Sequence, residues 1–298
     1  MIIRKSYLCL SKEEQSDSMI SIIDAVKDGA RKLKVSGVES PDYDSFELLS
    51  DIMGISRTDY LIRGKEPVPE DLYQMYERAI ERRCNHEPLQ HILGKAWFYG
   101  REYVINNQVL VPRFDTEIVV EKALGVIDDG MSVLDMCTGS GCIIITLALE
   151  RSLKRAVGVD LSTGALEVAK TNVKKLGATV DIVQGDLFSA LDDNNDKFDV
   201  IVSNPPYIET AVIESLSEEV KLFDPLMALD GFEDGLHFYR CITEESRKFL
   251  NKSGWLVYEI GYNQGLAVSE IMEHAGFEDV KVYKDYAGLD RVVMGKIM

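Results

Sequence analysis

The stretch 132-SVLDMCTGSGCIIITLALE-150 predicts a strand, a tight loop and a helix in immediate succession. Residues 132–136 are a short, mostly apolar segment, as in a buried strand, and residues 142–150 are a longer apolar run, as in a covered helix. The small residues between them let the backbone turn tightly and approach a ligand, with helix N–H groups pointing at it. The stretch therefore predicts a ligand-binding loop at the end of a buried strand.

The residues that follow repeat this alternation of strand and helix. RAVGVD precedes ALEVAKTNVKKLG, TVDIVQG and FDVIVSN come next, and GLHFYRCITEESRKFL leads into GWLVYEIG. Alternation of this kind predicts an α/β fold with a mostly parallel sheet and helices on both faces. EDVKVYKD and DRVVMGKI, separated only by a short turn, should form an antiparallel hairpin at the end of the chain.

Residues before this region have a different character. Residues 1–87 read as helical, with Ile20, Ile23, Ala30 and Leu33 on one face and with helices opening at Pro41 and Pro69. Aromatic and β-branched residues on both sides of Gly100 predict a β-hairpin. We expect a helical domain over 1–87, a hairpin linker over 88–111 and an α/β domain over 112–298.

Composition excludes several classes of protein. Of 298 residues, 50 are acidic and 33 are basic, which gives a formal charge of −17 and makes direct nucleic-acid binding unfavourable. Neither a signal peptide nor a membrane span is predicted. The five scattered cysteines lack a Cys-x-x-Cys pair, and Cys84, His86 and His91 lack an evident fourth ligand. We expect a cytoplasmic protein with no metal and no membrane partner.

The glycine loop and the next strand indicate a nucleoside-binding site. Asp160 ends that strand nineteen residues after Gly141, where a carboxylate can accept hydrogen bonds from ribose hydroxyls. Ile144 stands where a dinucleotide fingerprint needs its third glycine, and no P-loop is present. This pattern favours S-adenosyl-L-methionine (AdoMet), and the residues expected to bind it are Cys137, Thr138, Gly139, Ser140, Gly141, Asp160, Asp186 and Leu187. A ligand-free turn, a solvated acid at 160 and a turn acid at 186 remain the alternatives.

The tetrapeptide Asn204-Pro205-Pro206-Tyr207 closes the fourth strand of the predicted sheet. The Asn204 side-chain oxygen and the Pro205 carbonyl can accept both N–H bonds of a planar NH2 group and aim its lone pair at a methyl donor. Tyr207 offers a flat face for stacking, and Pro206 stiffens the backbone. These four residues are the predicted substrate site, with Asn204, Pro205 and Tyr207 as catalytic residues. A rigid turn with Tyr207 in the core is the alternative reading, and the motif leaves open which planar nitrogen is methylated.

Seven segments together resemble the peptide chain release factor glutamine methyltransferases, the HemK-like enzymes. They are EPLQHILGKAWFYG, VLVPRFDTEIVVE, VLDMCTGSGC, FDVIVSNPPYI, MALDGFEDGLHFYR, YEIGYNQG and KDYAGLDRVVMG. The resemblance implies a Rossmann-like AdoMet-dependent methyltransferase sheet with an antiparallel C-terminal hairpin, and a small N-terminal helical domain joined by a β-hairpin. It implies N5-methylation of the glutamine in the Gly-Gly-Gln motif of class I release factors, with AdoMet as donor. It also implies that Asn204 contacts the donor, besides the glycine loop, Asp160 and Leu187.

Two positions depart from the family pattern. Cys137 stands where the family usually has glycine, and Phe114 replaces a proline. We expect Arg113, Asp115 and Glu117 to order their loop by mutual ion pairs, with ordinary acids at a helix N-terminus as the alternative.

Two rival functions share these features. One is a nucleic-acid amine methyltransferase acting on adenine N6 or cytosine N4, which the net charge disfavours. The other is a scaffold that binds AdoMet without turnover. Glu259, at the end of a predicted strand, is interpreted as a structural acid close to the site.

Overall fold

The computed structural model describes residues 20–298, and the chain divides into two compact units with a boundary between Asn85 and His86. The first 19 residues of the predicted helical domain, Cys9 among them, lie outside the described residues. None of the helices in the described part of the chain is long and apolar enough to cross a membrane.

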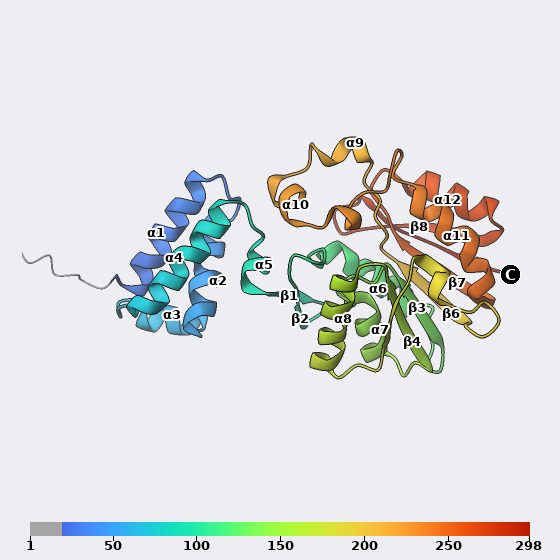
Figure 1. Cartoon of the computed structure of the whole chain (residues 1–298), viewed down its shortest axis with the longest axis horizontal. Coiled ribbons are helices and arrows are strands. Elements are labelled where there is room, and N and C mark those ends of the chain that lie inside the picture. Colours follow the sequence, from blue (N-terminus) through green and yellow to red (C-terminus); the bar gives the residue numbers. More distant parts are fainter. Residues whose placement is uncertain (1–19) are drawn as a thin grey trace, which may run out of the picture. The chain divides into compact units, whose positions relative to one another are not determined.

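The first unit is helical, as predicted (Figure 1). Its helices are α1 (Ile22–Val35), α2 (Pro41–Met53), α3 (Arg57–Arg63) and α4 (Glu70–Cys84). Pro41 occupies the first position of α2, where no intrahelical N–H is needed, and Pro69 is the N-cap of α4. Helix α3 is not among the predicted elements; it begins with a capping box between Ser56 and Asp59.

A buried polar contact joins three of these helices. The Tyr76 hydroxyl of α4 lies 2.6 Å from the Ser45 hydroxyl of α2, which donates to the Val26 carbonyl of α1. A Cβ at Gly29 would collide with the Tyr76 hydroxyl, so glycine allows α1 to approach at this point. The helices of this unit therefore pack closely around a tyrosine whose hydroxyl is satisfied.

The second unit begins with α5 (Leu89–Leu93) and the predicted hairpin, β1 (Lys95–Phe98) and β2 (Arg101–Val104). The two strands pair antiparallel across Tyr99 and Gly100, both of which have positive φ. Positive φ at both central residues matches the twist of a two-residue hairpin turn. The hairpin is therefore present at Gly100, as predicted.

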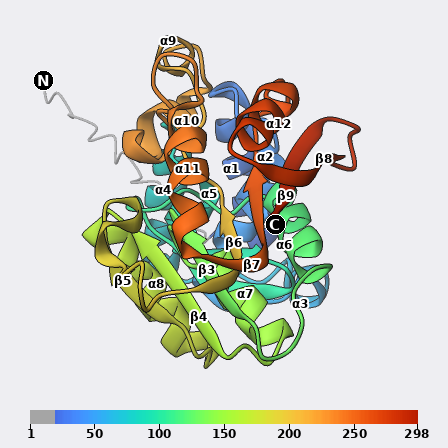
Figure 2. The same ribbon diagram turned by 90° about the vertical axis from the view of Figure 1, so that its right-hand side faces the viewer.

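A seven-stranded sheet follows, in the order β5-β4-β3-β6-β7-β9-β8 (Figure 2). Its strands are β3 (Ser132–Met136), β4 (Arg155–Asp160), β5 (Asp181–Gln184), β6 (Phe198–Ser203), β7 (Leu250–Glu259), β8 (Phe277–Lys284) and β9 (Asp290–Ile297). Strands β3 to β7 are parallel, and β9 pairs antiparallel with β7 and β8. The predicted parallel sheet with its antiparallel end is confirmed.

Long helices cover both faces of this sheet: α6 (Glu117–Leu124), α7 (Cys142–Glu150), α8 (Thr163–Leu176), α11 (His237–Phe249) and α12 (Gly265–His274). Val133 and Val200 pack in a cluster with α6 and α7, whereas their neighbours Leu134 and Ile201 pack with α11 and α12. Successive side chains of a strand point to opposite faces, so one apolar run supplies two cores.

Short helices lie in the connections: η1 (Phe114–Thr116), η2 (Leu187–Ala190), α9 (Thr210–Ile213), α10 (Glu218–Phe223) and η3 (Leu226–Ala228). The segment from α9 to η3 joins the tetrapeptide after β6 to α11, so it passes the carboxyl edge of the sheet.

Candidate active site

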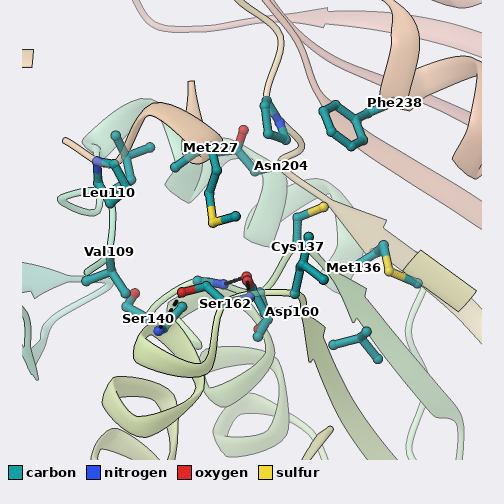
Figure 3. A pocket seen from close by; sticks show the side chains of 18 of the residues that line it. Val109, Leu110, Met136, Cys137, Ser140, Asp160, Ser162, Asn204, Met227 and Phe238 are labelled. Carbon is teal, nitrogen blue, oxygen red and sulfur yellow. Dashed lines mark hydrogen bonds between the residues drawn. The ribbon is translucent and has the colours of Figure 1, made fainter. Parts of the chain in front are cut away.

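A cavity of about 560 Å³ lies at the carboxyl ends of β3, β4 and β6 (Figure 3). This is the edge at which open α/β sheets bind ligands. The predicted site residues that line it are Cys137, Thr138, Gly139, Ser140, Asp160, Asp186, Leu187, Asn204 and Pro206. Gly141, Pro205 and Tyr207 belong to the same two loops but are not part of the lining. The structure thus brings together residues from four separate predicted segments.

The glycine loop turns sharply after β3. Cys137, Gly139 and Gly141 all have positive φ, at 62°, 55° and 78°. Gly141 precedes α7, and a Cβ there would lie only 2.9 Å from the Ile145 side chain. The loop therefore needs glycine at 141 both for its conformation and for the close packing behind it. Cys137 adopts the same left-handed region with a side chain, which is an uncommon and strained arrangement.

Asp160 holds the glycine loop in place. Its Oδ2 accepts a hydrogen bond from the Gly139 N–H at 2.8 Å, and its Oδ1 accepts one from the Ser162 N–H at 2.9 Å (Figure 3). Burial raises the pKa of Asp160, and these backbone N–H groups oppose that rise. Each oxygen can accept a further hydrogen bond, so the carboxylate remains able to bind two hydroxyls in the cavity.

Asp135, the residue before Met136 at the end of β3, supports the glycine loop and is not among the predicted site residues. It is fully buried, and its Oδ2 accepts a hydrogen bond from the Thr138 hydroxyl at 2.6 Å. Burial raises its pKa to about 7, and the Thr138 bond opposes the rise. Asp135 supports the loop from below and is not itself part of the cavity lining.

Asp186 and Leu187 follow β5 and line the cavity on the side of β4. Asp186 forms a capping box with Ser189 at the start of η2, and Leu187 has a φ of 48°. The alternative reading of Asp186 as a turn acid is therefore also correct, because it caps the turn that carries Leu187 into the lining.

The tetrapeptide follows β6 directly. Asn204 faces the cavity, Pro205 and Pro206 are buried, and Tyr207 is half-buried (Figure 3). Burial raises the pKa of the Tyr207 phenol. The tyrosine ring lies outside the cavity lining, so its predicted stacking on a substrate stays a prediction.

Gln264, just before α12, clamps the main chain of the tetrapeptide. Its Nε2 donates to the carbonyls of Tyr207 at 2.9 Å and Gly235 at 3.2 Å, and its Oε1 accepts from the Gly261 N–H at 2.9 Å. A Cβ at Gly235 would overlap the Tyr207 carbonyl, and the φ of Gly235 is +68°. Gly235, the second glycine of DGFEDG, thus allows the main chain at Tyr207 to come close, and the hydrogen bonds of Gln264 hold the two segments together.

Two walls of the cavity were not predicted. One is formed by residues 108–113 before η1, and the other by residues 225–228 around η3 together with Phe232 and Phe238. Leu110 and Met227 face the cavity from these walls (Figure 3). The quoted family segments VLVPRFDTEIVVE and MALDGFEDGLHFYR contain part of both walls, but no residue pattern within them indicates a lining role.

The expected mutual ion pairs of Arg113, Asp115 and Glu117 are wrong. Arg113 pairs with Asp224 at 3.9 Å and Asp115 with Arg291 at 3.4 Å, while Glu117 accepts a hydrogen bond from the Tyr99 N–H at 2.6 Å. Glu117 is the first residue of α6, as the alternative reading had it. The loop at residues 113–117 lies at the edge of the sheet, where segments far apart in the sequence meet. Its ion-pair partners, Asp224 and Arg291, therefore come from distant segments.

Cys84, His86 and His91 do not converge. His91 is buried in α5, and His86 Nε2 lies 3.2 Å from a Glu218 carboxylate oxygen. Within residues 20–298, no group of three or more His, Cys, Asp or Glu side chains has an arrangement that could hold a metal ion.

Two family models match successive parts of this chain. Residues 24–94 match the PrmC N-terminal domain, and residues 108–220 match the methyltransferase small domain. A methyltransferase from Pyrococcus furiosus shares the fold, with a TM-score of 0.51 and 18% identity over 67% of this chain and 90% of that one.

Two curated relatives are similar along most of their length. A release factor glutamine methyltransferase of Geobacter sulfurreducens is 40% identical over 265 residues, covering 89% of this chain and 93% of the relative. That of Bacillus subtilis is 42% identical over 252 residues, covering 82% and 87%. The chain therefore belongs to the release factor glutamine methyltransferase family.

Proposed function

We propose that this protein transfers a methyl group from AdoMet to the side-chain nitrogen, N5, of the glutamine in the Gly-Gly-Gln motif of class I release factors. One observation carries the proposal. Asn204 faces the same cavity as Asp160 and the glycine loop, so an acceptor amide and a nucleoside donor can meet there. The membership of the chain in the release factor glutamine methyltransferase family supports the choice of acceptor.

The residues of the cavity suit AdoMet. Asp160 retains acceptor capacity for ribose hydroxyls, Leu187 and Asp186 would flank the adenine, and residues 137–141 would approach the amino-acid part of the donor. The cavity volume is within the range of small-molecule sites. When bound, AdoMet supplies a methyl group activated by a positively charged sulfur.

Asn204 and Pro205 act on the acceptor. An amide nitrogen is a poor nucleophile because its lone pair is delocalised into the carbonyl group. Acceptance of its two N–H bonds by the Asn204 oxygen and the Pro205 carbonyl orients the lone pair toward the methyl carbon. The new N–C bond forms as the C–S bond breaks, its electron pair stays on sulfur, and the nitrogen then loses a proton to water.

Mass spectrometry of the release factors tests this proposal. The protein is incubated with AdoMet and with release factors from its own source, and the peptide containing Gly-Gly-Gln is analysed for a 14-dalton gain on glutamine (about one methylene). We expect one added methyl group on that glutamine. AdoMet binding without any methylated glutamine would contradict the substrate assignment and favour the scaffold alternative.

A nucleic-acid substrate is distinguished by binding at low salt. Tight, salt-sensitive retention of RNA or DNA would favour the amine methyltransferase alternative, which the charge of −17 disfavours. We further propose that the protein acts in the cytoplasm without a metal and without binding nucleic acid or membrane directly. The division into 1–87, 88–111 and 112–298 likewise remains our proposal.

A further inference from the structure

Glu259 is a buried acid beside the tetrapeptide that the proposed mechanism does not use. It is the last residue of β7, and β7 runs parallel to β6 with Tyr258 opposite Ser203. The next residue of each strand is therefore Glu259 on β7 and Asn204 on β6. Glu259 thus stands at the same sheet edge as Asn204, one strand away.

The carboxyl group of Glu259 is only partly satisfied. The residue is 1% exposed, and its Oε2 has no hydrogen-bond partner among the described residues. The Thr116 hydroxyl hydrogen-bonds to the carboxyl group, and Thr116 itself lines the cavity. A single threonine therefore connects this acid to the site.

The cations near Glu259 are already paired with other acids. Arg291 Nη2 lies 3.1 Å from an Asp285 oxygen and 3.4 Å from an Asp115 oxygen, and Arg113 pairs with Asp224. The titratable and charged groups that face Glu259 from the surrounding elements are Arg113, Asp115, Cys142, Arg291, Tyr207 and Tyr239. Glu259 has no ion pair of its own within residues 20–298.

A buried carboxylate without an ion pair costs several kcal/mol, so its retention needs a reason. Burial is the main cause that raises the pKa of Glu259 to about 7, and Thr116 and Arg291 oppose the rise. Near neutral pH the group is therefore divided between a charged and a neutral form. Groups perturbed in this way by burial are concentrated at functional sites.

We propose that Glu259 is a positioning residue for the acceptor half of the site. Its carboxylate, beside the Thr116 hydroxyl at the same sheet edge as Asn204, favours the positive charge that moves from sulfur to the acceptor nitrogen during transfer. The inference rests on the proposed function. It assigns no covalent or proton-transfer step to Glu259, because the product nitrogen loses its proton to water.

The test is the pH profile of methyl transfer to full-length release factor. Wild-type kcat should rise between pH 6 and 8, because Glu259 ionises over this range, which extends about one pH unit on either side of its pKa. Glu259→Gln should lower kcat at the upper end roughly tenfold or more and remove the rise, with the AdoMet Kd within about threefold of wild type. The exposed Glu278→Gln provides the matched control and should leave both unchanged.

The Thr116→Val variant supplies a second measurement, the midpoint of the pH profile of kcat. This midpoint would not change if Glu259 had only a structural role. Loss of the Thr116 hydrogen bond, which opposes the effect of burial, should shift the midpoint of the pH profile upward while the carboxyl group stays in place. Thermal unfolding of each variant checks that the domain is folded. If Glu259→Gln lowers the Tm sharply, the midpoint of the pH profile of Thr116→Val still shows whether the ionisation of Glu259 controls kcat.

Two results would overturn the inference: a Glu259→Gln enzyme whose kcat keeps the wild-type rise with pH, or a Thr116→Val midpoint that does not move. Wild-type protein that binds AdoMet but methylates no release factor would instead overturn the proposed function. The two failures are therefore distinguishable, because the second is already visible before any variant is made.

Discussion

Asn204 and Asp160 line one cavity from different strands, so their substitution should affect different steps. Asn204→Ala removes an acceptor for the substrate N–H but leaves the ribose-binding carboxylate in place. We expect kcat to fall by about 10²–10³-fold or more and the AdoMet Kd to change by no more than a few-fold. Calorimetric AdoMet titration and single-turnover methyl transfer measure the two quantities. Equal losses in both would contradict the acceptor role of Asn204.

Asp160→Ala should mainly weaken the binding of AdoMet, in contrast to Asn204→Ala, which should mainly lower kcat. It removes the acceptors expected for ribose and also the acceptor of the Gly139 N–H, so the loop loses an anchor. We expect AdoMet affinity to fall by about 10–100-fold (roughly 1.4–2.8 kcal/mol). Asp181→Ala, at an exposed acid of the neighbouring strand, is the control. An unchanged dissociation constant in Asp160→Ala would remove this residue from the donor site.

Cys137 stands where the family usually has glycine, and its backbone conformation shows what this difference costs. Its φ of 62° lies where glycine is free of strain, and a left-handed residue with a Cβ costs about 1–2 kcal/mol. Cys137→Gly should therefore leave the Tm of the domain unchanged or raise it, whereas Cys137→Val should lower it by several degrees because branching at Cβ worsens the strain. A Cys137→Val protein as stable as wild type would show that the loop relaxes at this position.

At the scale of elements, Gln264 ties the start of α12 to the loop after β6. Gln264→Ala leaves three backbone groups without their side-chain partner, those of Tyr207, Gly235 and Gly261. We expect a loss of about 1–3 kcal/mol in unfolding free energy and a lower kcat, because the tetrapeptide is no longer fixed. Urea unfolding and turnover are compared with those of Asn263→Ala, an exposed neighbour. Full activity in Gln264→Ala would show that the prolines alone hold the tetrapeptide.

The strands and long helices could be predicted because their pattern is local. The mostly apolar segment of β3 and the longer apolar run of α7 differ in length, and small residues separate them. The same local reasoning placed Asp160 and Asn204 at strand ends, which a parallel sheet brings to one edge.

The missed features depend on contacts between distant segments. The walls at residues 108–113 and 225–228 become part of one cavity only when the sheet has formed, and neither segment has a periodic apolar face. The loop at 113–117 was misjudged because Arg113 and Asp115 find partners at Asp224 and Arg291, more than a hundred residues away. Helices as short as α3 and α5 have too few turns for periodicity to reveal them.

At the scale of the whole molecule, buried acids make stability depend on pH. Burial raises the pKa values of Asp135, Asp224 and Glu259 to about 7, 6 and 7, well above those of unfolded chains. Between pH 4 and 7 the folded state therefore binds more protons than the unfolded state. The free energy of unfolding must then fall as pH rises through this window, by up to about 1.4 kcal/mol per pH unit for each group.

We expect the Tm of the unit from His86 to Met298 to decrease steadily from pH 5 to pH 8. Acids with lowered pKa values, such as Asp196 and Asp234, act in the opposite sense, but they do so near and below pH 4. The formal charge of −17 adds repulsion that grows over the same interval. Scanning calorimetry at constant ionic strength measures the slope. Glu259→Gln should flatten it because one of the three groups no longer titrates, and a Tm that rises from pH 5 to pH 8 would show that the buried acids are charged throughout.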